Sequence, residues 1–149
     1  MCIRDRSRTL ASVGNTRGGA TWNGDGTILM ARDNVIMRVP DTGGPTTQVT
    51  KLDANRKEIL QALPVFLADG RHFVYVAAFA KLEDAGIYLA SIDGTAAPER
   101  VIQLQPNRFN GMAYVSGFLV YMNEGMLIAQ RTEESGHCLL YTSPSPRDS

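Results

Sequence analysis

The feature that most constrains this chain is a pattern that occurs three times. The stretches "ATWNGDGTILMA" and "PVFLADGRHFVYVA" each carry an aromatic residue, an Asp-Gly pair and then an apolar run, and "MAYVSGFLVYM" is a degenerate third copy. Asp25 and Asp69 lie 44 residues apart, and Gly117 follows Gly70 by 47. A fixed period of this kind indicates a repeat architecture, in which each unit buries its apolar surface against its neighbours.

Gly and Asp divide each copy into short runs. Asp25-Gly26, Asp69-Gly70 and Ser116-Gly117 are predicted two-residue hairpin turns, because these residue types tolerate the positive φ angles of tight turns. The runs between them are short, rich in β-branched and aromatic residues and bounded by Gly, Asp or Pro, which is typical of strands. The sequence therefore predicts an all-β fold, and the period is close to the roughly 40 to 45 residues of a four-stranded β-propeller blade.

The repeat predicts a partial β-propeller, an open arc of two complete four-stranded antiparallel blades with parts of two flanking blades. The expected boundaries are about 19–52 and 62–105 for the complete blades, 109–132 for a partial blade, and 8–13 for the last strand of a preceding one. The stretch "LDANRKEILQAL" is interpreted as a connector with one helical turn, from which the next strand begins near Leu63.

The two ends of the chain differ from the repeats. "MCIRDR" and "CLLYTS" can be encoded by one inverted-repeat DNA element read on opposite strands, and both ends resemble translated sequencing-adaptor sequence. We therefore expect residues 1–6 and 138–149 to be artefacts without fixed structure, and residues 7–137 to be a fragment of a longer protein. Cys2 and Cys138 both lie in these ends, so disulfide, zinc and thiol-nucleophile chemistry is not expected in the fragment.

Charge and hydropathy exclude two classes of partner. Fifteen basic residues balance fifteen acidic ones, and no basic run stands out, which argues against a surface for nucleic acid or anionic lipid. The longest apolar stretches, such as "FVYVAAFA", fall far below the roughly 20 residues that span a bilayer. We expect no nucleic-acid partner, no membrane contact within this segment and no cofactor.

Arg17 is the first of three candidate ligand-facing residues. An Arg beside Gly18 and Gly19 could bind an anion through its side chain and the backbone N–H groups. The favoured interpretation is a loop that leads into the innermost strand of a blade, where glycines allow a close approach of the chain near the axis.

Trp22 and His72 are the other two candidates. Trp22 occupies the same place in its repeat as Phe66 and Tyr114, so it is expected to pack between adjacent blades, with a ligand-stacking platform as the alternative. His72 lies in "GRHFVYV", where we expect a strand histidine with a local hydrogen bond, because a ligand or general base needs partners within reach.

Catalytic and metal-binding motifs are not found in the sequence. Asp25 and Asp69 are interpreted as turn residues, since their loops lack the alternating oxygen ligands of a calcium loop. The chain contains no G-x-S-x-G, no "HRD" and no "DFG", so we expect neither a catalytic residue nor a metal site.

The motifs "GNTRGGATWNGDGTILMA", "LPVFLADGRHFVYV", "GIYLASIDG" and "GFLVYMNEGMLIAQ" together resemble the TolB-like, WD-type β-propeller found C-terminal to the kinase domain of bacterial serine/threonine protein kinases. The resemblance covers nearly all of residues 7–137. Gly24 and Ala68 stand where that family has Pro before the Asp-Gly pair, which would loosen the turns.

This resemblance implies a six-bladed, non-catalytic propeller, often located outside the cytoplasm, that binds or senses a protein or a small molecule. Its other partner would be the remaining blades of its own parent chain. The same blade pattern also resembles the propeller of prolyl-oligopeptidase-like serine peptidases and the periplasmic scaffold protein TolB, so these alternatives stay open.

Overall fold

The computed structural model describes residues 8–14, 18–94, 97–104 and 111–132. Within these ranges the chain forms eleven strands and a single turn of 3-10 helix, η1 (Leu82–Asp84), so the predicted all-β class is confirmed. The strands are β1 (Ala20–Trp22), β2 (Thr27–Arg32), β3 (Val35–Pro40), β4 (Thr47–Gln48), β5 (Glu58–Phe66), β6 (His72–Phe79), β7 (Gly86–Ser91), β8 (Glu99–Gln103), β9 (Met112–Val115), β10 (Phe118–Asn123) and β11 (Met126–Arg131).

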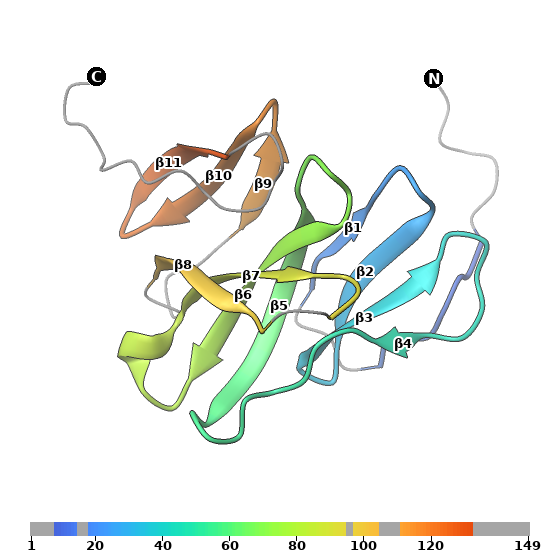
Figure 1. Ribbon diagram of the computed structural model, residues 1–149, viewed down its shortest axis with the longest axis horizontal. Coiled ribbons are helices and arrows are strands. Elements are labelled where there is room, and N and C mark those ends of the chain that lie inside the picture. Colours follow the sequence, from blue (N-terminus) through green and yellow to red (C-terminus); the bar gives the residue numbers. More distant parts are fainter. Residues whose placement is uncertain (1–7, 15–17, 95–96, 105–110, 133–149) are drawn as a thin grey trace.

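The strands form three antiparallel sheets in chain order (Figure 1). The first sheet is β1-β2-β3-β4, the second is β5-β6-β7-β8, and the third is β9-β10-β11. Each sheet is a meander, because short loops can join only antiparallel neighbours. Three of the connections are two-residue hairpin turns with positive φ at both positions, as type I′ turns require: Asp33-Asn34, Ser116-Gly117 and Glu124-Gly125.

The two turns that the sequence predicts at Asp25-Gly26 and Asp69-Gly70 are longer than two residues. In the first sheet the Asn23 N–H donates to the Thr27 carbonyl, which leaves a loop of residues 24–26. In the second sheet the Leu67 N–H donates to the His72 carbonyl, which leaves residues 68–71. The prediction of two-residue turns was wrong at both places, because side-chain acceptors bind the loop backbone and stabilise the extra residues.

The connector before β5 contains no α-helical turn. Residues 54–57 form turns that begin at Asp53, whose carboxylate accepts the backbone N–H groups of Asn55 and Arg56. The strand then starts at Glu58, earlier than the Leu63 that the sequence predicts. Leu63 lies instead at an irregularity within β5, with φ 56°.

The predicted strand at 8–13 is also absent, since residues 8–14 have no strand structure. This segment nevertheless lies against the first sheet. The Arg8 guanidinium donates to the Thr42 carbonyl, and Arg32 Nη1 donates to the Ser12 carbonyl at 3.2 Å. A strand needs a neighbouring strand for its backbone groups, and none lies beside this segment among the described residues.

The second sheet packs between the first and the third (Figure 1). We call the face of a sheet that points to the next sheet in chain order its forward face, and the opposite one its backward face. The backward face of the second sheet carries Phe73 and Tyr75, which pack with Leu29 of the first sheet. Its forward face carries Val74 and Val76, which pack against the third sheet. The strict alternation of a strand thus supplies two cores.

The first strand of the second sheet, β5, contacts the first strands of the other two sheets, β1 and β9. Thr21 Oγ1 accepts the backbone N–H of Phe66 at 3.1 Å. Gly19 lies so close to β5 that an added Cβ would be 2.8 Å from the Leu63 Cα. The close approach predicted for the glycine pair is therefore present at Gly19. No helix of the described residues is long and apolar enough to cross a membrane.

Candidate functional site

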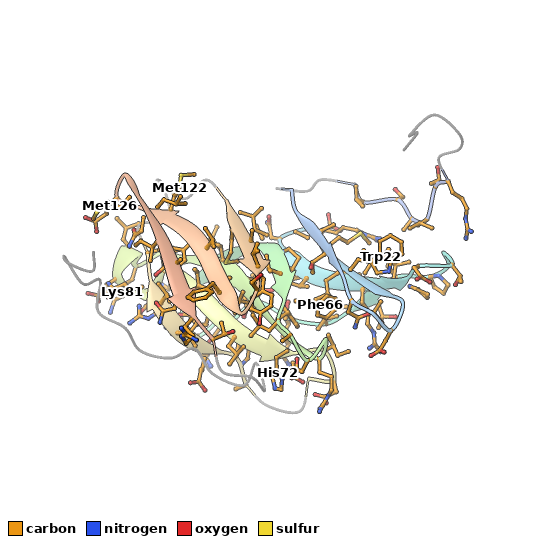
Figure 2. The ribbon with its side chains drawn as sticks, turned by 90° about the horizontal axis from the view of Figure 1, so that it is seen from above. Trp22, Phe66, His72, Lys81, Met122 and Met126 are labelled. Atoms are coloured by element: carbon orange, nitrogen blue, oxygen red, sulfur yellow. The ribbon has the colours of Figure 1, made fainter. Side chains whose placement is uncertain are left out.

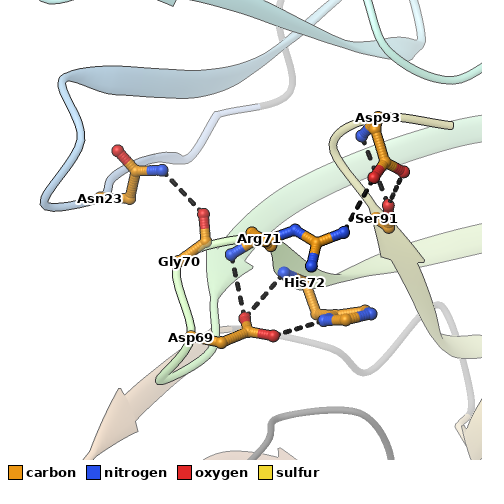
Figure 3. A network of polar contacts seen from close by, with 7 residues as sticks. All are labelled: Asn23, Asp69, Gly70, Arg71, His72, Ser91 and Asp93. Atoms are coloured by element: carbon orange, nitrogen blue, oxygen red, sulfur yellow. Dashed lines mark hydrogen bonds and ion pairs between the residues drawn. The ribbon is translucent and has the colours of Figure 1, made fainter.

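A group of polar side chains lies at one end of the second sheet, where the β5–β6 and β7–β8 loops meet (Figure 3). We call Asp69, Arg71, His72, Ser91 and Asp93 the loop cluster. Arg71 Nη2 contacts Asp93 Oδ2 at 2.9 Å, and the Ser91 hydroxyl donates to Asp93 Oδ1. The paired register of β6 and β7 places His72 directly opposite Ser91, so the two loops are held side by side.

Asp69 organises the β5–β6 loop. Its Oδ1 accepts the backbone N–H groups of Arg71 and His72, each at 2.9 Å, and its Oδ2 contacts His72 Nδ1 at 2.5 Å. Partial burial alone would raise the pKa of this carboxyl, but the hydrogen bonds and the charge of His72 outweigh it, so the pKa lies below its usual value. Asp69 is a turn residue and His72 is a strand histidine with a local hydrogen bond, as the sequence predicts, although the turn is longer than expected. A ligand-binding role of His72 stays a prediction.

The loop cluster contains the residue types of a hydrolytic triad, a serine, a histidine and an aspartate. A nucleophilic serine must be reachable by substrate and must be able to give its proton to the histidine. Ser91 is 7% exposed, and its hydroxyl proton is directed at Asp93. The arrangement holds the two hairpin loops together.

Asn23 joins the first sheet to the second, a role that sequence reasoning missed. Its Oδ1 accepts the N–H groups of Asp25 and Thr27, both at 2.9 Å, and its Nδ2 donates to the Gly70 carbonyl at 2.7 Å (Figure 3). The signal available in the sequence was an Asn at the start of an Asp-Gly loop, where its side chain can bind backbone groups two residues on. That signal indicates the bonds within the loop, but not the contact with Gly70 of the second sheet.

A buried polar link between the first two sheets was also missed. Gln61 is 1% exposed, and its Oε1 accepts the Thr50 hydroxyl while its Nε2 donates to Glu58 at 2.9 Å. Burial raises the pKa of the Glu58 carboxyl, although the Gln61 hydrogen bond opposes that shift. No sequence motif marks these residues, because the contact depends on how two sheets pack.

The sequence predicts that Trp22 packs between adjacent blades, but its side chain is exposed. It is 65% exposed, whereas Phe66 is 6% exposed and packs in the core between the first and second sheets. Tyr114, the third member of the set, packs against the core between the second and third sheets. Trp22 points the other way from Thr21 and so lies on the backward face of the first sheet, where no further sheet of the described residues covers it (Figure 2). Its Nε1 donates to Asp41 Oδ2 at 3.3 Å.

The backward face of the first sheet carries an open apolar cavity of about 470 Å³. Its walls are the segment 8–13 on one side and the sheet on the other. The sheet contributes Ile28, Met30 and Val39, with Gly18 and Gly19 at the rim. Arg17, the residue next to this rim, lies outside the described residues, as do both ends of the chain.

No cluster of three or more His, Cys, Asp or Glu side chains that could hold a metal ion occurs among the described residues. No protein-family model matches the chain, and no curated protein shows significant similarity to it.

Proposed function

We propose that this chain is part of a β-propeller that serves as a non-catalytic binding or sensing module of a larger bacterial protein, the sensor region of a serine/threonine protein kinase. The observation that carries the proposal is the repeated packing of three meander sheets in chain order, each on the next, with their first strands adjoining. Blades of a propeller are arranged in this way, with the first strand of each blade nearest the axis.

The position of Trp22 supports the same proposal. In a propeller another blade would precede the first sheet and cover its backward face. Trp22 would then be buried like Phe66, its counterpart in the second sheet. We therefore assign Trp22 to packing rather than to ligand stacking. The ligand, a protein or a small molecule, would contact the loops at the two ends of the sheets.

A non-catalytic role is favoured by how the loop cluster uses its polar groups. Ser91, Asp93 and Asp69 bind neighbouring backbone and side-chain groups of their own hairpins. Side chains engaged in this way position loops, and binding proteins present their ligand sites on loops held by a rigid scaffold. Location outside the cytoplasm is part of the proposal and rests on the resemblance alone.

The test is to read the source DNA beyond the codons for Arg6 and His137. We expect further repeats of the same pattern, and a kinase domain followed by a membrane helix upstream. An upstream region without a kinase domain would remove the kinase assignment. A G-x-S-x-G motif downstream would instead indicate a serine peptidase, and a signal peptide without a kinase would indicate a TolB-like scaffold.

A further inference from the structure

Asn23 and Gly24 form an Asn-Gly pair at the start of the β1–β2 loop. Glycine has no β-carbon, so its backbone nitrogen can approach the side chain of the preceding residue more easily than that of other residue types. In an Asn-Gly pair this nitrogen can attack the side-chain amide carbon of the asparagine. Gly24 is exposed, and an added Cβ would meet nothing within 4 Å. The pair therefore carries a chemical reactivity that the proposed binding function does not use.

The reaction is spontaneous deamidation, and water is its only co-reactant. The Gly24 nitrogen gives its proton to solvent and forms a bond to Asn23 Cγ. The bond between Cγ and Nδ2 then breaks, and Nδ2 takes up a proton and leaves as ammonia. Water opens the resulting five-membered succinimide at either carbonyl, which yields aspartate or isoaspartate at position 23.

The folded loop opposes this reaction because it holds both polar atoms of the Asn23 amide. Oδ1 accepts the backbone N–H groups of Asp25 and Thr27, both at 2.9 Å, and Nδ2 donates to the Gly70 carbonyl at 2.7 Å (Figure 3). The Asn23 N–H also donates to the Thr27 carbonyl at 3.0 Å, which fixes the backbone on either side of Gly24. Asn23 is only 9% exposed. Attack on Cγ therefore requires these contacts to open first.

We propose that Asn23-Gly24 is a deamidation site that the contact with the second sheet keeps closed. The reaction takes place when the β1–β2 loop separates from the β5–β6 loop, which carries Gly70. The three side-chain hydrogen bonds of Asn23, at ordinary strength, correspond to roughly a 100-fold preference for the closed loop. The inference is independent of the proposed function, because it uses only contacts within the first two sheets.

Deamidation would make the separation of the two loops permanent. Aspartate and isoaspartate both replace the Nδ2 donor with a carboxylate oxygen, which cannot donate to the Gly70 carbonyl. Two acceptors would then face each other across the 2.7 Å that the hydrogen bond now spans. Isoaspartate also lengthens the backbone by one carbon directly after Trp22, where β1 ends. The modified chain therefore loses the contact through which Asn23 joins the first sheet to the second.

The first experiment compares the deamidation rate of the full chain in neutral buffer with its rate in concentrated urea. Trypsin releases residues 18–32 as a peptide in which Asn23 is the sole Asn, and mass spectrometry distinguishes its amide from its acid. Incubation in heavy-oxygen water marks the product that forms before digestion. We expect the rate in buffer to be roughly 100-fold lower than the rate in urea. The Asn110-Gly111 pair in the urea sample gives the intrinsic rate of an Asn-Gly bond.

Two variants separate the chemistry from the fold. Gly24→Ala should keep the fold, because an added Cβ has room, but it should deamidate about tenfold more slowly in urea because that carbon restricts the nitrogen. Thr21→Val removes the acceptor of the Phe66 N–H, a second link between β1 and β5, at 3.1 Å. This variant should deamidate about tenfold faster than the wild type in buffer and at the same rate in urea.

A second measurement tests the consequence of the modification. Both the wild type and Gly24→Ala are aged in urea and refolded, and their urea unfolding curves are compared with those of the fresh proteins. Ageing modifies Asn110 in both proteins, so the difference between them belongs to Asn23. We expect the unfolding midpoint of the wild type to fall further than that of Gly24→Ala.

Four results would overturn the inference. Equal wild-type rates in buffer and urea would show that the fold does not close the site. A faster rate in buffer would show that the two N–H groups on Oδ1 promote the attack, as an oxyanion hole does. A Thr21→Val rate in buffer equal to that of the wild type would show that the opening does not involve the second sheet. Equal falls of the midpoint in both aged proteins would show that deamidation does not release the contact.

Discussion

The substitution Gly86→Ala tests the packing of the fourth strand of the second sheet. Gly86 begins β7 and pairs with Gln103 of β8. A Cβ added at this position would be 2.1 Å from the carbonyl oxygen of Ile102, whereas ordinary contacts begin at 3.4 Å. The obstacle is backbone, so a change of side-chain rotamer cannot relieve it. We expect β8 to move away by about 1.3 Å.

The cost follows from what that movement breaks. Overpacking in a well-packed region costs about 1 to 3 kcal/mol. The hydrogen bond from the Leu104 N–H to the Ala85 carbonyl is already 3.4 Å long, and its loss adds about 1 kcal/mol. The lower entropy of the unfolded Ala variant offsets roughly 0.4 to 1 kcal/mol. We expect the free energy of unfolding to fall by about 1 to 4 kcal/mol, compared with the roughly 5 to 15 kcal/mol of a typical domain.

Urea unfolding followed by circular dichroism measures this change, with Gly24→Ala as the control. Gly24 also lies outside the positive-φ region, and an added Cβ would meet nothing within 4 Å. This control should match the wild type or gain up to about 1 kcal/mol. A Gly86→Ala variant within about 0.5 kcal/mol of the wild type would refute the reasoning, because β8 would then not lie against β7 in this register.

Three further predictions concern the contacts between sheets and the loops. Leu119→Ala, at a fully buried position, should lower the free energy of unfolding by about 2 to 5 kcal/mol in urea titrations, whereas Leu82→Ala on the surface should change it by less than about 0.5 kcal/mol. Asn23→Ala removes three hydrogen bonds of a nearly buried side chain, so thermal unfolding should show a loss of about 1 to 3 kcal/mol. Asp69→Asn should destabilise the chain at neutral pH, because the lowered pKa means that the folded state favours the ionised carboxylate. That stabilising contribution is present above the usual carboxyl pKa and is lost as pH falls through the lowered one, so the two proteins should converge in acid unfolding curves; a difference that stays constant down to strong acid would contradict this.

The fold class could be predicted from sequence because turn residues and strand composition are local properties. Asp33-Asn34 and Ser116-Gly117 can adopt positive φ at low cost, and the apolar runs between such turns are too short for helices. The contacts of Asn23 and Gln61 could not be predicted in the same way, since they join segments from different sheets. The start of β5 was missed because Asp53 resembles a helix N-cap while its carboxylate in fact closes a turn.

Loop length limits what an alignment of the repeats can predict. The Asp-Gly pairs align the first two repeats with a spacing of 44 residues, but the loop in the second sheet has one residue more. Ile28 pairs with Trp22 in the first sheet, and Phe73 pairs with Phe66 in the second. Ile28 and Phe73 are therefore equivalent at a spacing of 45 residues. In a strand, a slip of one residue moves every side chain to the opposite face. An alignment on Asp-Gly would place Leu29 with Phe73, although these two side chains point toward each other from different sheets. Only the pairing of strands shows which face of each sheet is forward.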